Sequence, residues 1–594
     1  MKLFKYGLPL AALAVLASCS NDNIDAPVGG QTPEVGDGSM YMTVNVSLPT
    51  AAGTKADSFA GYEPGSEDEY AVNGVQLVLF KLADGKTDAE NEAEYYDTID
   101  LGFGNLADDT DFSDVQKKFQ ATFQIKGIEL DAEKNPVDKS KFYGLLIVNP
   151  NASLPEFGDD VKTFNKWNLK TMKAADATGA DYTSVMRSNG FMMSNAPVGD
   201  NENGTSTTLV FVNTKKFATS PAEAKEAAAT FFVQRGVAKV RLAGENFNDM
   251  PVYDAKDSEK EGASVKVDNW YLDVTNQVTF PVQNVYGVDG TYGFGTWYNL
   301  GAHYTASTST GTQGVDNHIW WAIDPNYFGD ESDVDNTGSF SSVNAQSKIN
   351  WTLVPTYSAN NANSYAYCLE NTMDYDQQIQ AQTTRVIFKA KFIFNKYELA
   401  DGTPITEDWT KTGDEAKNAG FIVYNDRAML VAIEDLPKDE EGNAVIPAAA
   451  SQVALNTIIT DAEKLDTYLK GLMIGAATDE VDWYPNGETY YVAYIRHFNN
   501  DEAPLPSGLD VTSSKFDAAS LATTFDMPQL GRYGVLRNNV YNVNVLGFFG
   551  YGSPEVPEPE PGTPDDKEPE KKYNAIVDIN VLNWAIRQND YMPR

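Results

Sequence analysis

The chain has 594 residues and a formal net charge of −39, which excludes a nucleic-acid-binding protein because phosphates require basic surfaces. It contains 31 tyrosines and 29 phenylalanines, a composition typical of packed β structure rather than of disorder. The two cysteines are Cys19 and Cys368. If Cys19 carries a lipid, as argued next, Cys368 has no partner and no disulfide is expected.

Residues 1–19 have the pattern of a lipoprotein signal peptide. Two lysines precede a short apolar run at residues 8–16, which is too short to span a bilayer. The run ends in Leu-Ala-Ser-Cys, where small residues allow cleavage and Cys19 then accepts the lipid. The alternative is an ordinary secretory signal with a chance cysteine. The lipoprotein interpretation predicts a chain anchored to a membrane by lipid.

Residues 20–55 are predicted to hold a spacer and then a removable first strand. Residues 40–48 alternate at the strand period, and one face carries Met40, Met42, Val44, Val46 and Leu48. A glycine-containing loop follows. Lys55 is the first basic residue after the signal, so the Lys55–Ala56 bond is the predicted site of a trypsin-like cut; the alternative is a solvated loop lysine.

Many short strands predict an all-β fold of two β-sandwich domains, at residues 56–230 and 231–550. Apolar runs at 75–80 and 142–148 are typical of buried strands in the first domain. Similar runs occur at 231–240, 385–392, 489–497 and 539–545 in the second. A capping box at Ser220–Glu223, with proline at the first helical position, predicts a short helix through Ala229.

The C-terminus is predicted to carry a strand on a tether. Residues 551–572 are rich in proline and glutamate, which favours a stiff, charged spacer. Residues 573–594 contain a further strand, and one of its faces carries Ala575, Val577, Ile579 and Val581. A strand held away from its own domain is suited to complete the sheet of another molecule.

No catalytic or metal-binding pattern is present in the sequence. The three histidines, His303, His318 and His497, lack the spacing of a metal site, and no nucleophile elbow or phosphate-binding loop occurs. We therefore expect a protein that is not an enzyme and that has no catalytic residues, no cofactor and no metal.

Taken together, these features resemble the fimbrillins of the Bacteroidales, the lipoprotein-derived pilins of the FimA and Mfa type, and most closely the Mfa-type shaft subunit. The most specific segments are Phe232–Val240, Tyr367–Thr372, Tyr484–Tyr491 and Arg537–Val543. The resemblance implies two transthyretin-like sandwiches, an outer-membrane lipoprotein precursor and a surface fimbria. It also implies a maturation protease that cuts after a basic residue; family members are commonly cut after arginine, whereas the candidate here is Lys55.

For this chain, the resemblance implies polymerisation by donor-strand exchange for adhesion. Its partners would be other copies of itself and related fimbrial subunits, joined head to tail. Residues 40–48 match the displaced strand and residues 575–584 the donor. The competing hypothesis is a monomeric surface lipoprotein that binds glycans or host proteins, with its last strand folded back on its own sheet.

Overall fold

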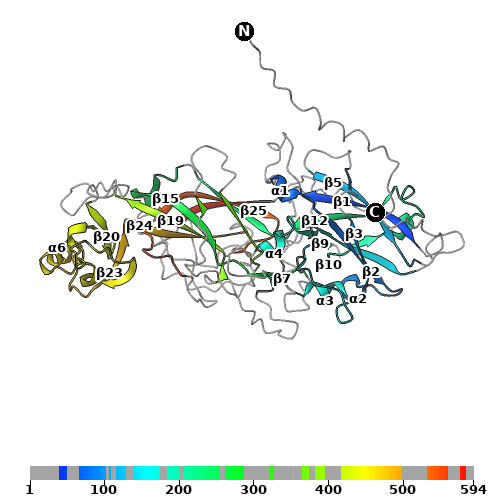
Figure 1. Cartoon of the computed structure of the whole chain (residues 1–594), viewed down its shortest axis with the longest axis horizontal. Helices are drawn as coiled ribbons and strands as arrows, with labels where there is room; N and C mark the ends of the chain where they lie inside the picture. The colour runs from blue at the N-terminus through cyan, green and yellow to red at the C-terminus, as the bar shows by residue number, and fades with distance from the viewer. Residues whose placement is uncertain are drawn as a thin grey trace, which may run out of the picture.

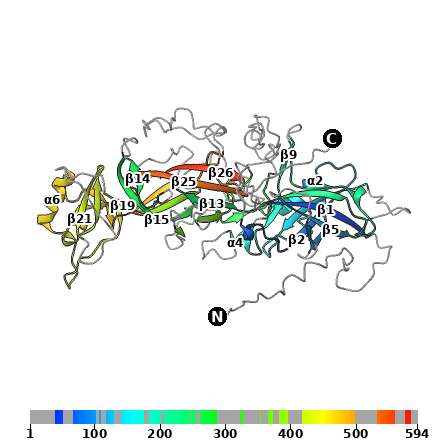
Figure 2. The same cartoon turned by 90° about the horizontal axis from the view of Figure 1, so that it is seen from above.

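The computed structural model describes residues 39–49, 66–101, 106–108, 116–128, 139–170, 172–173, 183–200, 205–244, 246–253, 261–285, 322–326, 352–353, 364–372, 382–394, 417–497, 531–558 and 575–583. Within these ranges the fold is built almost entirely from strands, with few short helices, which confirms the predicted all-β class. Three sheets follow one another along the longest axis of the molecule (Figures 1 and 2). No helix of the described part is long and apolar enough to cross a membrane.

The first sheet contains the N-terminal strands. Its order is β3 (Glu94–Leu101), β2 (Val75–Leu82), β6 (Lys141–Val148), β8 (Met193–Asn195), β12 (Ala227–Arg235), β1 (Met40–Pro49), β5 (Gln116–Ile125) and β4 (Leu106–Asp108), with β11 (Val210–Val212) on β6. The sheet folds over on itself. A Cβ atom placed on Gly144 of β6 would lie 2.6 Å from the ring of Phe231 on β12, so these two strands pack face to face and require a glycine there.

The second sheet contains the C-terminal strands. Its order is β18 (Tyr365–Cys368), β13 (Ala238–Ala243), β25 (Asn539–Phe549), β14 (Met250–Tyr253), β15 (Glu261–Asp273), β19 (Arg385–Ile393) and β24 (Glu488–Tyr494), with β17 (Thr352–Leu353) on β15 and β26 (Ala575–Asn583) on β25. This sheet is also folded into a sandwich. The ring of Phe548 on β25 contacts Phe388 of β19 at 5.6 Å and Tyr491 of β24 at 4.5 Å between centroids.

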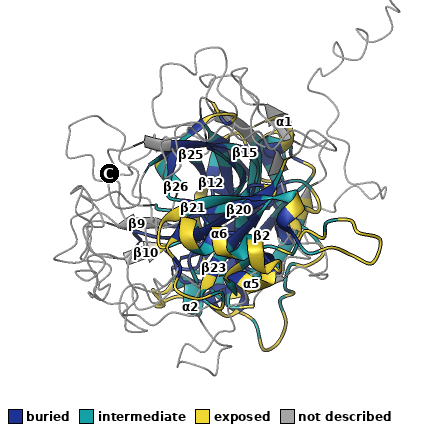
Figure 3. Cartoon of the chain, turned by 90° about the vertical axis from the view of Figure 1, so that its left-hand side faces the viewer, coloured by how far each residue is buried: buried dark blue, intermediate teal, exposed yellow. Residues whose placement is uncertain are grey.

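A third sheet was not anticipated from the sequence. It consists of β21 (Arg427–Ala432), β20 (Asn418–Tyr424), β23 (Glu480–Pro485) and β22 (Ala450–Ala454), covered by α5 (Leu455–Ile458) and α6 (Ala462–Leu472). It has its own hydrophobic cluster around Trp483 and Leu455. Figure 3 shows the exposed faces of its helices at the end of the molecule opposite the N-terminal sheet.

The remaining elements are short. They are the helices α1 (Glu67–Tyr70), α2 (Ala89–Glu92), α3 (Phe164–Asn168) and α4 (Ser184–Arg187), the 3-10 turns η4 (Thr214–Lys216) and η10 (Ile433–Asp435), and the strand pairs β9 (Val198–Asp200) with β10 (Thr205–Thr207) and β7 (Met172–Lys173) with β16 (Val278–Thr279).

The predicted helix through Ala229 was wrong. Residues 221–223 form only a turn, and β12 already begins at Ala227. The capping sequence does form locally, since the amides of Glu223 and Ala224 both donate to the Ser220 carbonyl at 3.2 Å. The strand then takes over because Ala227 and the residues after it pair with β1, and this long-range pairing outweighs the helical propensity of alanine.

Candidate functional site: the first strand, the last strand and the junction

The predicted removable strand, β1, lies inside the N-terminal sheet rather than at its edge. It pairs antiparallel with β5 over its whole length, from Met40 opposite Ile125 to Pro49 opposite Gln116. Its other edge pairs in parallel with β12, from Thr43 opposite Ala227 onward. Both hydrogen-bonding edges of β1 are therefore used.

The predicted apolar face of β1 is buried in the core. Met40, Met42, Val44 and Val46 are each at most 1% exposed and belong to the main N-terminal hydrophobic cluster. Leu48 lies in the same strand, and its side chain is outside the described residues. Loss of such a strand would uncover an apolar strip and two rows of backbone donors and acceptors, on β5 and on β12.

The predicted modification sites are outside the described part of the chain. Cys19, Lys55 and Ala56 lie in segments whose placement is not described, so lipidation and cleavage stay predictions.

The chain is fixed again shortly after the predicted cleavage loop. Glu69, in α1, is 1% exposed; its carboxylate lies 2.8 Å from Lys239 Nζ and accepts a hydrogen bond from the hydroxyl of Tyr367. Its main-chain carbonyl accepts from Arg235 Nε at 2.8 Å. Burial alone would raise the pKa of Glu69, but the hydrogen bonds from Lys239 and Tyr367 outweigh it and hold the pKa below its ordinary value.

Glu69 thus joins three segments that are distant in sequence. Arg235 ends β12 of the N-terminal sheet, whereas Lys239 and Tyr367 belong to β13 and β18 of the C-terminal sheet. The sequence marks Glu69 as the last residue of a capping box that begins at Ser66, whose amide donates to Glu69 Oε2 at 2.6 Å, but only the tertiary fold buries it. We conclude that the start of the protein left after the predicted cut would be anchored between the two sheets.

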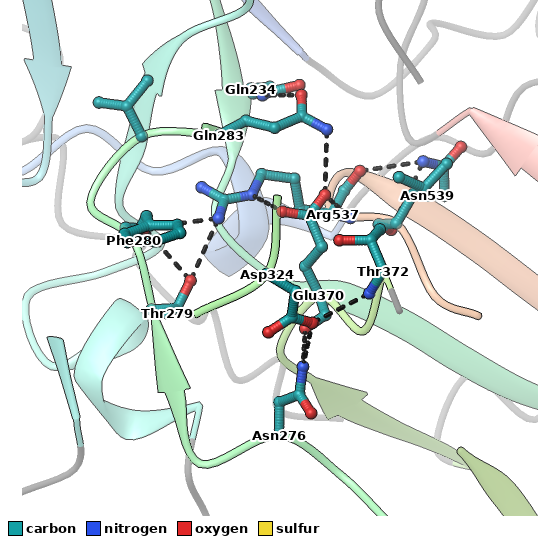
Figure 4. A network of polar contacts seen from close by, with 12 residues as sticks. Gln234, Asn276, Thr279, Phe280, Gln283, Asp324, Glu370, Thr372, Arg537 and Asn539 are labelled. Carbon is teal, nitrogen blue, oxygen red and sulfur yellow. Dashed lines mark hydrogen bonds and ion pairs between the residues drawn. The ribbon is translucent and has the colours of Figure 1, made fainter. Parts of the chain in front are cut away.

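A second buried network lies at the same junction (Figure 4). Arg537 donates through Nε to Glu370 Oε2 at 2.9 Å and through Nη2 to Thr279 Oγ1 at 3.1 Å. Gln283 connects Glu370 to Gln234 of β12 through hydrogen bonds of 3.0 and 2.9 Å. Burial raises the pKa of Glu370 although Arg537 opposes the shift. The fold thus gathers three of the four segments that carried the family resemblance at one buried junction.

The predicted donor strand, β26, lies on the C-terminal sheet of its own chain. It pairs antiparallel with β25, from Asn583 opposite Asn539 to Ala575 opposite Phe548, and runs beside it in Figure 2. Ala575, Val577 and Ile579 are half-buried against the C-terminal cluster, and Asp578 is exposed. Val581 faces Tyr541 in the register, and its side chain is outside the described residues.

The structure therefore does not bring the first and last strands together. β1 is enclosed on both edges, whereas within the described residues β26 pairs along one edge only. This arrangement is the one expected from the competing monomer hypothesis, and it is also a state from which a donor strand could be released.

The beginning of the predicted tether is docked. Ser553 exchanges two backbone hydrogen bonds with Tyr490 of β24, at 2.8 and 2.9 Å, and Val556 is buried in a small cluster on β19 and β24. The carbonyl of Pro557 accepts a hydrogen bond from Arg385, which is ion-paired with Asp273. Residues 553–557 of the predicted tether are therefore held on the C-terminal sheet.

Sequence reasoning missed the docked tether, Glu69 and the third sheet. Two of these had a local signal: Ser66–Glu69 has the pattern of a capping box, and Asp461 caps α6 by accepting from the amides of Glu463 and Lys464. Contacts such as Arg385 to Pro557 join residues far apart in the chain, and no local period encodes them.

Comparison with known proteins supports the fimbrial interpretation at the C-terminal end. Residues 518–590, which include β25 and β26, match the family described as "Major fimbrial subunit protein type IV, Fimbrillin, C-terminal". No curated protein matches the chain. The family match is confined to the C-terminal end of the chain, and it supports the resemblance to fimbrillins.

Several solved structures are similar along most of the chain, at low scores. A proposed cell adhesion protein from Parabacteroides distasonis has a TM-score of 0.36 and 9% identity, covering 92% of this chain and 98% of that one. One from Bacteroides eggerthii has a TM-score of 0.34 and 11% identity, covering 94% and 98%. The tip fimbrial protein Mfa3 from Porphyromonas gingivalis, truncated at its C-terminus, has a TM-score of 0.30 and 10% identity, covering 92% and 100%. Scores at this level do not establish a shared fold.

Proposed function

We propose that this protein is a structural fimbrial subunit rather than an enzyme, exported as an outer-membrane lipoprotein and polymerised by donor-strand exchange. A protease would cut at Lys55–Ala56 and release β1, and β26 of a neighbouring copy would take its place. The observation that carries the proposal is the contrast between an enclosed first strand and a last strand paired along one edge, in a region that matches fimbrillins.

Hydrogen bonding favours the transfer of β26 once β1 is gone. On its own sheet β26 forms one ladder, with β25, and its apolar face is only half-buried. In the vacated position it would form two ladders, with β5 and β12, and its apolar face would reach the core that Met42 and Val44 occupy. Each buried backbone group left without a partner costs about 1–3 kcal/mol, so an open position would be strongly unstable.

The predicted tether gives β26 a reach beyond its own sheet. Residues 559–574 join the docked segment to β26, and a fully extended chain of this length spans about 50 Å. A strand that is given to one neighbour while another is received is a head-to-tail contact that does not close, which generates a fibre.

The test compares the full chain with a chain truncated after Lys572, both carrying the recognition sequence of a site-specific protease at Lys55–Ala56, because a lysine-specific enzyme could also cut after Lys571 and Lys572 and remove β26. We expect the full chain to form ladders that resist mild denaturation on a non-boiled gel, and the truncated chain to remain a folded, cleaved monomer. Circular dichroism verifies the fold of both. A full chain that stays monomeric after cleavage at Lys55 would favour the second candidate, a monomeric surface lipoprotein, which the pairing of β26 with β25 supports.

A further inference from the structure

We propose that the donor strand enters the β1 position in a single register, with Ile579 in place of Val44 and Asp578 in place of Thr43, and that Asp578 is the residue that weakens the joint. This inference rests on the proposed function and concerns the alignment of the incoming strand with β5 and β12. It follows from a polar slot beside β1.

The slot is formed by two groups around Thr43. Thr43 is only 3% exposed, and its hydroxyl donates to the carbonyl of Ala224, which is equally buried. The same hydroxyl lies 2.8 Å from Thr122 Oγ1 on β5. A hydroxyl has one hydrogen, and that of Thr43 is used on Ala224, so Thr122 must be the donor in the second bond. The slot therefore requires a side chain that both donates and accepts.

The next outward position has a different requirement. Asn45, two residues along β1, accepts a hydrogen bond from Gln120 Nε2 at 3.2 Å through its Oδ1 atom. The opposite face of β1 is apolar throughout its described positions. An incoming strand must therefore supply an apolar face, an acceptor at the position of Asn45 and a donor–acceptor at the position of Thr43.

One register meets most of these requirements. With Ile579 in place of Val44, the face of Ala575, Val577, Ile579 and Val581 covers the four buried positions of β1, and Asn580 replaces Asn45. Asp578 then fits poorly in the slot, and Asn583 replaces Leu48 at the end of the apolar face.

The two neighbouring registers that keep the same face inward fit less well. Placing Asn580 in the slot moves Asn583 to the position of Val46, where a 1% exposed site would bury an amide among apolar groups. Placing Ile576 in the slot leaves the Ala224 carbonyl without a donor and the Thr122 hydroxyl without an acceptor. By contrast, Asp578 in the slot still accepts from Thr122.

The remaining misfit makes Asp578 the residue that weakens the joint. An ionised carboxylate accepts from Thr122 but has no hydrogen for the Ala224 carbonyl, so two acceptors face each other. In the monomer Asp578 is exposed on β26, where its charge is solvated. The charge therefore favours the resting position on β25 over the neighbour's sheet, so the contact formed after removal of β1 is weaker than it would be with a residue that both donates and accepts.

The test uses the full chain, cleaved at Lys55, with Asp578→Asn and Asp578→Thr, two replacements that both donate and accept. Asp84→Asn is the matched control, because it removes the same charge at an exposed site on the N-terminal sheet side. We expect polymers of both Asp578 variants to dissociate in urea about tenfold more slowly than wild type, the effect of one recovered hydrogen bond. Adding Thr122→Val to Asp578→Thr should remove part of this gain.

The outcomes separate this inference from the proposed function. Wild-type polymers that dissociate at the same rate as both Asp578 variants would overturn the register while leaving strand exchange intact. If Asn580→Val makes the polymers dissociate much faster in urea while neither Asp578 variant changes the rate, Asn580 rather than Asp578 occupies the slot. A wild-type chain that never polymerises after cleavage would overturn the proposed function and this inference with it.

Discussion

Lys239 and Glu69 form an ion pair in which Nζ lies 2.8 Å from Oε1 and both side chains are more than nine-tenths buried. The pair fastens α1, just after the predicted cleavage loop, to the first strand of the C-terminal sheet. Tyr367 also donates to the carboxylate, and Arg235 of the N-terminal sheet donates to the main-chain carbonyl of Glu69, so this one residue contacts both sheets.

Glu69→Ala is expected to destabilise the uncleaved chain by about 3–5 kcal/mol, because it leaves the Lys239 ammonium buried without its counter-charge. Asp68→Ala, at the exposed neighbouring position, should change stability by less than about 0.5 kcal/mol. Urea unfolding monitored by circular dichroism measures both. Equal effects of the two variants would contradict the anchoring role.

The contribution of Glu69 to stability should also depend on pH. Since the folded pKa of Glu69 is lowered from 4.5, this contribution is present above pH 4.5 and is lost as the pH falls through the folded value.

The same substitution should have different costs in the first and last strands. Val44→Ala empties a fully buried site and is expected to cost about 2–3 kcal/mol in the uncleaved monomer, whereas Val577→Ala, in a half-buried strand, should cost under about 1.5 kcal/mol. In fibres the order should reverse, because β1 is then absent and Val577 is buried. Urea midpoints of the monomer and of the polymer measure the two cases, and an unchanged order would argue against exchange.

Arg385 on β19 should be far more important than Lys389 on the same strand. Arg385 pairs with Asp273, and both are at most 1% exposed. Arg385→Met leaves the buried Asp273 carboxylate without its counter-charge, which should lower the stability by about 3–5 kcal/mol. Lys389 pairs with Glu488 at 3.0 Å in a partly exposed contact, and Lys389→Met should cost at most about 1 kcal/mol. Hydrogen exchange should also show faster opening at the Ser553 amide in Arg385→Met alone. Unaltered exchange there would mean that Arg385 does not hold the tether.

Asp324 should make the protein less stable as the pH rises toward neutrality. Burial raises its pKa from 3.8 to about 6, so the folded chain holds the proton more tightly than the unfolded chain. The resulting stability is fully present below pH 3.8 and is lost as the pH rises through about 6, up to about 3 kcal/mol in all. Asp324→Asn should remove this part of the pH dependence between pH 4 and 7, whereas exposed Asp249→Asn should retain it. Parallel pH profiles for wild type and Asp324→Asn would refute the assignment.

Local alternation in the sequence was sufficient to identify the elements that matter most. Apolar residues occur at every second position from Met40 to Val46, and likewise at Ala575, Val577 and Ile579, and in both strands these side chains face a core. A strand period is a property of neighbouring residues, so it can be recognised without knowing the partner strands.

The partners themselves were decided only by the tertiary structure. Alternation cannot tell that β1 is enclosed by β5 and β12, that β26 lies on β25, or that Ala227 continues into a strand after a capping sequence. Glu69 illustrates the same limit for the site, because its burial depends on Arg235, Lys239 and Tyr367, which lie more than 160 residues away. The sequence by itself therefore determined the strands and their apolar faces, whereas the fold decided which edges are paired and which charges are buried, since these depend on contacts between distant parts of the chain.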